Sequence, residues 1–154
     1  MLLDLKKFAA ELAMRRNKAA LLLTPDLTAQ RTCAEQIATA IGATHLDLLD
    51  RFQSDVGLTA QLPGFSPDDF FKLLSAEKTK FVVVSGLEFL LAAWISQDDA
   101  KTVKLKLCQS IELWERTPAL LLVVQPDSIF ADYQPTRHRG SQVIIHLSQT
   151  LSLA

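Results

Sequence analysis

The chain has 154 residues, of which 49% are hydrophobic and 21% charged, with a formal net charge of -1 at pH 7. This length and composition predict a single globular domain over residues 1–154 and exclude a disordered chain. The near-zero net charge excludes the strongly basic footprint of a nucleic-acid-binding domain, and no apolar run reaches the ~18 residues of a membrane helix. The first residues lack a basic region followed by an apolar core, so we expect no signal peptide and a cytoplasmic location.

Predicted helices and strands alternate along the chain. Apolar residues at helical spacing predict an amphipathic N-terminal helix over residues 2–16. Continuous apolar runs predict buried strands at residues 19–23, 81–85, 120–124 and 141–147, and residues 45–49 are predicted to form a short strand of mixed character. Residues 50–66 and 126–141 carry turn formers and are predicted to be irregular. The alternation predicts an α/β fold with three αβα layers and a mainly parallel five-stranded sheet.

Three further helices connect the central strands. The first is capped by Thr24 or Thr28 and ends at Gly42, and its predicted buried face is Cys33, Ile37, Ala40 and Ile41. The second starts at Ser66, with proline next and acids in its first turn, and the third covers residues 100–116. Cys33 and Cys108 both lie in apolar helical patterns, so we expect buried thiols without a disulfide.

The loop after the first strand has the length of a phosphate-binding loop. That motif reads Gly-x4-Gly-Lys-Ser/Thr, because its glycines let backbone N–H groups surround phosphate while the Lys reaches the terminal phosphates. Here Pro25 and Gln30 occupy the glycine positions, Arg31 the Lys position and Thr32 the hydroxyl position. An ordinary strand-to-helix loop, ATP binding and weak anion binding at a helix N-terminus all remain open.

Three other strand ends carry polar residues. Ser85 stands where a Mg²⁺-binding acid would follow the third strand, and Glu88 is placed either to polarise water or to open a helix. Gln125 follows the fourth strand as a candidate phosphate sensor or a plain turn residue. Arg137 and Arg139 precede the last strand as candidate contacts to phosphate or to a partner, or as solvated loop residues. His138 and His146 lack further ligands at metal-binding spacing, so we expect no metal site.

Together these four strand ends resemble the P-loop NTPase superfamily in its AAA+-like branch, over nearly the whole chain from Ala19 to Leu147. The resemblance implies a five-stranded sheet of order 5-1-4-3-2 and assembly into larger complexes, with Arg137 or Arg139 as an arginine finger. The small size and the run after the third strand are similar to the BrxF-like small proteins of BREX phage-defence systems. The chain departs from the family at both glycines, at the Lys and at the metal acid.

Three hypotheses follow. The first is a non-catalytic, degenerate P-loop subunit without a cofactor, which binds proteins in a DNA-processing or phage-defence complex through the 2–16 helix and through Arg137 and Arg139. The second is a weak nucleotide-binding switch or ATPase, which uses ATP, Mg²⁺, Arg31, Thr32 and Glu88 and is completed by a partner. The third is a flavodoxin-like or Rossmann-like domain with a small-molecule site. The strand order discriminates, because strand 1 beside strand 3 would exclude the AAA+-like order.

Overall fold

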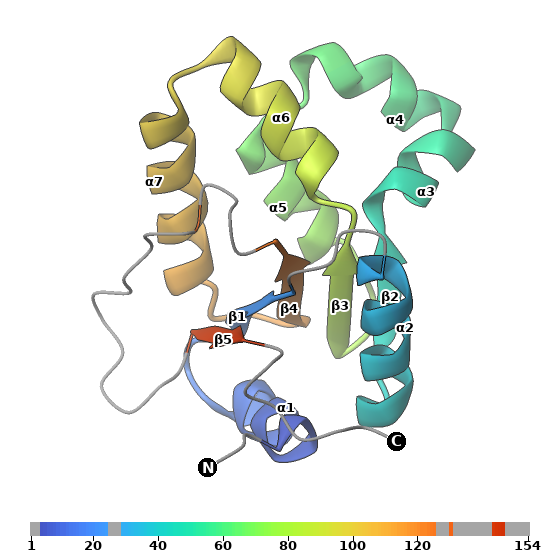
Figure 1. Ribbon diagram of the computed structural model, residues 1–154, viewed down its shortest axis with the longest axis vertical. Helices are drawn as coiled ribbons and strands as arrows, with labels where there is room; N and C mark the ends of the chain where they lie inside the picture. The colour runs from blue at the N-terminus through green and yellow to red at the C-terminus, as the bar shows by residue number, and fades with distance from the viewer. Residues whose placement is uncertain (1–3, 25–28, 126–129, 131–142, 147–154) are drawn as a thin grey trace.

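The computed structural model describes residues 4–24, 29–125, 130 and 143–146 (Figure 1). The strands are β1 (Ala19–Leu23), β2 (Thr44–Asp47), β3 (Phe81–Ser85), β4 (Ala119–Val124) and β5 (Ile144–His146). The helices are α1 (Leu5–Met14), α2 (Gln30–Ile41), α3 (Leu48–Ser54), α4 (Val56–Gln61), the 3-10 turn η1 (Leu62–Gly64), α5 (Pro67–Ser75), α6 (Glu88–Gln97) and α7 (Ala100–Glu112). Within these described ranges, no helix is both long and apolar enough to cross a membrane.

The sheet has five strands in the order β2-β3-β4-β1-β5, and every strand pair is parallel. The predicted parallel five-stranded sheet is therefore confirmed. Read from the other edge, the order is 5-1-4-3-2, the one that the resemblance implies. Because β1 pairs with β4 and β5 rather than with β3 or β2, the flavodoxin and Rossmann orders of the third hypothesis are excluded.

Helices cover both faces of the sheet, which gives the three predicted layers. Successive side chains of a strand point to opposite faces, so each strand of the sheet supplies both cores. On one face Ala20 and Leu22 of β1 pack with residues of α1 and α2. On the other face Leu21 and Leu23 pack with residues of α5, α6 and α7. All five residues of β1 are buried, as its continuous apolar sequence predicted.

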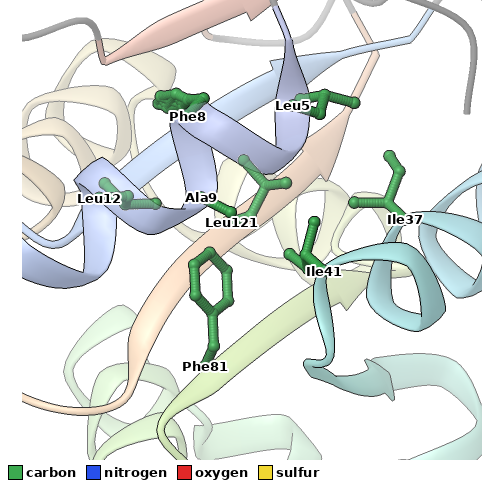
Figure 2. A pocket seen from close by; sticks show the side chains of 8 residues that line it. All are labelled: Leu5, Phe8, Ala9, Leu12, Ile37, Ile41, Phe81 and Leu121. Atoms are coloured by element: carbon green, nitrogen blue, oxygen red, sulfur yellow. The ribbon is translucent and has the colours of Figure 1, made fainter.

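Helix α1 belongs to the core of the domain. Its Leu5, Phe8 and Leu12 are buried against α2 and the sheet, around an apolar cavity of about 10 Å³ (Figure 2). The helix lies within the predicted range 2–16, of which residues 1–3 are outside the described part. The hypothesis that its apolar face docks a partner is wrong, because the chain's own α2 and sheet already cover that face.

A buried asparagine joins the end of α7 to the start of β1. Asn17 is 5% exposed, and its side-chain amide donates to the carbonyl oxygens of Ile111 at 2.7 Å and of Glu112 at 3.1 Å. These carbonyls lie in the last turn of α7, where the helix ladder ends. The contact fixes residues 15–18 beside residues 113–116, at the end of the sheet where the parallel strands begin.

The prediction of an irregular segment over residues 50–66 is wrong. The predicted second strand ends at Asp47, whose carboxylate accepts the Asp50 N–H at 3.1 Å and so caps α3. Asp55 caps α4 in the same way, accepting the Leu58 N–H at 3.2 Å. The acidic N-caps therefore start two short helices in a segment that was predicted to be irregular from its turn-forming residues. The predicted start of α5 is confirmed, with a capping box between Ser66 and Asp69.

The buried face of helix α2 differs from the predicted one. Its buried residues are Gln30, Ala34, Ile37 and Ala38, whereas Cys33, Ala40 and Ile41 are only partly buried. Ala29 occupies the N-cap without a side-chain hydrogen bond, so Thr24 does not cap this helix, and Thr28 lies outside the described residues. Gly42 ends the helix with a left-handed backbone, as predicted.

Cys108 is buried, which raises the pKa of its thiol to about 12, and neither cysteine forms a disulfide.

Candidate functional site

Four residues meet where β1, β3 and β4 end. Gln30, the first residue of α2, is 3% exposed and donates from Nε2 to Glu88 Oε2 at 3.0 Å. The backbone N–H of Gly86 donates to Gln30 Oε1 at 3.0 Å, and that of Gln125 donates to Glu88 Oε2 at 3.0 Å. We call Gln30, Gly86, Glu88 and Gln125 the Gln30 network. It joins the carboxyl edge of the sheet through side chains of the chain itself.

The local sequence explains the positions of Glu88, Gly86 and Gln30 in the Gln30 network. Glu88 is in the first turn of α6, where a carboxylate is favoured by the helix dipole. Gly86 has φ +77°, a left-handed conformation that glycine adopts without strain. Gln30 stands at the second glycine position of the predicted phosphate loop, and its side chain bonds Gly86 and Glu88. The predicted site residues Glu88 and Gln125 are therefore neighbours.

Two buried polar atoms beside the network have no hydrogen-bond partner among the described residues. They are Thr24 Oγ1, on a residue 2% exposed, and Glu88 Oε1. Thr24 follows β1 and donates its backbone N–H to the Val124 carbonyl at 2.9 Å, so it flanks Gln125 from one side while Glu88 flanks it from the other. Because an unpaired buried polar atom is costly, such atoms mark places where a ligand or a water molecule binds.

The other two predicted nucleotide-site residues point elsewhere. Arg31 donates to Asp50 Oδ1 at 3.1 Å and lies 3.9 Å from Asp47 Oδ2, which draws its guanidinium toward the end of β2. Thr32 is exposed on the next position of α2. The structure therefore does not bring either residue to the Gln30 network. Arg137, Arg139 and His138 lie outside the described residues, and so does the side chain of His146.

A second polar cluster joins β2 to β3. His45 Nε2 lies 2.8 Å from Ser85 Oγ, and Ser85 Oγ donates to Asp47 Oδ2 at 3.0 Å. Since the single hydroxyl proton of Ser85 goes to the Asp47 carboxylate, His45 must donate through Nε2–H. Ser85 is fully buried, so its hydroxyl is out of reach of a substrate. The sequence reasoning missed this cluster, which depends on the register that pairs Asp47 with Ser85.

Burial lowers the pKa of His45 below its ordinary value of 6.5, with Arg31 acting in the same direction and Asp47, Glu35 and Asp50 opposing it. The folded protein then binds fewer protons than the unfolded chain as the pH falls below about 6.5. We expect stability to be full above that pH and to decline as the pH drops through the folded-state pKa. Urea unfolding between pH 8 and 5 measures this slope.

The control for this pH dependence is His45→Gln, which keeps a donor for Ser85 but cannot titrate. Its stability should change less over the same range. An equal slope in both proteins would assign the pH dependence to other groups.

The described residues contain no group of three or more His, Cys, Asp or Glu side chains arranged to hold a metal ion. No protein-family model, curated protein or solved structure matches the chain.

Proposed function

We propose that the chain is a non-catalytic, degenerate P-loop NTPase-like subunit that acts through protein–protein contacts in a larger complex. The observation that carries this proposal is the position of the Gln30 side chain. It stands where the phosphate-loop motif has its second glycine, which has no side chain, and it bonds both Gly86 N–H and Glu88. The strand order supports the comparison with AAA+-like domains.

The chemistry at the strand ends favours loss of hydrolysis. A phosphate loop needs free backbone N–H groups, a Lys for the terminal phosphates and an acid for Mg²⁺. Here Gln30 replaces the second glycine of the loop and its carboxamide is bonded to Glu88 and Gly86, and Arg31 is paired with Asp50. Ser85 supplies a hydroxyl that is bonded to Asp47 and so does not replace a metal-binding carboxylate.

The resemblance extends the proposal to the biological setting. A DNA-processing or phage-defence complex in the cytoplasm, as for BrxF-like proteins, is the setting that we propose, and Arg137 and Arg139 are the proposed partner contacts. The chain would need no cofactor in this role.

A weak nucleotide-binding switch, completed by a partner, is the second candidate. It is favoured by the unpartnered Thr24 Oγ1 and Glu88 Oε1, and the Glu88 carboxylate contacts Gln30 at the start of α2. This helix start has no side-chain cap, and the strand order reverses at the junction of β1 and β4, the usual ligand position in open α/β sheets.

Titration with ATP and Mg²⁺ separates the two candidates. We expect no rise in melting temperature of the wild-type chain up to about 5 mM ATP·Mg, whereas a site with a Kd near 50 µM would add about 2.7 kcal/mol of stability. Differential scanning fluorimetry gives the readout. A stabilisation of the wild-type chain that is lost in Thr24→Val, which removes the unpartnered Thr24 hydroxyl, would overturn the non-catalytic proposal in favour of the switch.

A further inference from the structure

Two stretches that contact each other carry no charged residue and no histidine, although 21% of all residues are charged. They are the twelve residues 56–67 and the nine residues 89–97. Trp94 Nε1 donates to the Phe65 carbonyl at 2.7 Å, and Gln97 Nε2 donates to the Pro63 carbonyl at 3.4 Å. The two stretches are therefore in contact, and Figure 1 shows α4 and α6 at the same end of the molecule, beyond the tips of the strands.

This uncharged surface is exposed. Val56 is 85% exposed, and Ile95 on α6 is 37% exposed. None of the six residues of α4 is buried. Isolated helices of this length are marginal in water, and α4 is held by its Asp55 cap and by Leu58, which packs against the core.

Acids lie at the ends of the two uncharged stretches. Asp55 and Asp68 flank the first stretch, and Asp98 and Asp99 follow the second, all of them exposed. We call residues 55–68 and 89–99 the acidic pole. An apolar centre with a charged rim is the usual anatomy of a protein interface.

The opposite end of the molecule also exposes apolar side chains, but the charged residues near them are mostly cations. Exposed apolar side chains there are Met14 at 86% and Leu113 at 56%. The cations around them are Arg16, Lys18, Lys80 and Arg116. We call these six residues the basic pole. Glu115 also lies there and is paired with Arg16, Nε to Oε2 at 3.0 Å.

Backbone contacts hold the basic pole together. The Lys18 N–H donates to the Trp114 carbonyl at 2.7 Å, and the Ala119 N–H donates to the Lys80 carbonyl at 2.9 Å. These residues precede β1, β3 and β4, whereas the acidic pole follows β2 and β3. Because all strands are parallel, the two poles lie at opposite ends of the sheet.

We propose that the acidic pole of one copy of the chain binds the basic pole of a second copy, head to tail. A symmetric contact between two acidic poles would bring like-charged rims together, whereas the head-to-tail contact pairs acids with cations around two apolar centres. This inference rests on the proposed role in protein–protein contacts and names its surface and its partner. A head-to-tail contact leaves a free pole at each end, so it continues into a ring or a filament.

The test uses two charge substitutions at equally exposed positions, Val56→Glu in the acidic pole and Met14→Glu in the basic pole. Light scattering after gel filtration should show wild-type masses above the monomer at about 100 µM protein and ~50 mM salt, shifting toward the monomer at ~0.5 M salt. Each variant alone should be monomeric. An equimolar mixture should form a dimer of twice the monomer mass, since each variant keeps the pole that the other has lost.

Leu105→Glu is the matched control, because Leu105 is 58% exposed on α7 outside both poles. It should assemble like the wild type, and circular dichroism melting should show all three variants folded. A monomeric wild-type chain at low salt would overturn the inference, as would assembly that survives Val56→Glu or a mixture that stays monomeric. The ATP titration is independent of these outcomes, because it can be read on the monomeric Val56→Glu chain.

Discussion

Replacement of Leu12 by alanine should lower the free energy of unfolding by about 3 to 5 kcal/mol. Leu12 is 1% exposed and lines the small cavity between α1, α2 and the sheet, together with Phe8, Ile37 and Phe81. Truncation would enlarge a void that is already present. Its walls are apolar, so water does not compensate for the lost contacts. Urea denaturation measures the loss.

Met14→Ala provides the comparison on the same helix. Met14 is 86% exposed, and its truncation should change stability by no more than about 0.5 kcal/mol. Equal, small effects of the two substitutions would show that α1 is dispensable for the core. In that case its apolar face would again be a candidate for docking a partner.

A second large loss is expected for Gly86→Ala, about 2 to 4 kcal/mol. Gly86 has φ +77°, and a Cβ there would lie 3.2 Å from Asp47 Oδ1 and 3.2 Å from the backbone nitrogen of Leu49. The added methyl group therefore meets strain in its own backbone and crowds the first turn of α3. It also displaces the N–H that bonds Gln30.

Gly42→Ala measures how much of the stability loss comes from the left-handed backbone alone, without the Cβ contacts. Gly42 has a similar φ of +72°, but a Cβ there meets nothing within 4 Å. We expect a loss of about 1 to 2 kcal/mol, the cost of a left-handed backbone alone. If thermal or urea unfolding gave the same loss at both glycines, the contact between residue 86 and the start of α3 would contribute nothing.

The strands were predictable because burial on both faces leaves a direct signal in the sequence. Ala19–Leu23 and Phe81–Ser85 are continuous apolar runs, and the structure places both inside the sheet. The helices α3 and α4 were missed because they are too short to show a helical period. Their formation depends on the side chains of Asp47 and Asp55, which read equally well as turn residues.

The candidate site was predictable only where it follows from topology. Parallel strands end at one edge, so Glu88 and Gln125 could be expected to meet. Which way a side chain turns from there is decided by packing, and Arg31 turns toward Asp50 instead. The pairing of His45 with Ser85 required the register of two strands separated by 33 residues, from Leu48 to Lys80, which no local pattern encodes.

The strand order also has a consequence for synthesis on the ribosome. β1 is made early, yet the strands that pair with it in the described part of the chain are β4 and β5, which begin at Ala119 and Ile144. At ~5–20 residues per second, the nascent chain carries this fully apolar strand without a neighbour for roughly 5 to 20 seconds. During that interval β1 is the segment most exposed to chaperones and to aggregation, and the domain can close only when nearly all of it has been translated.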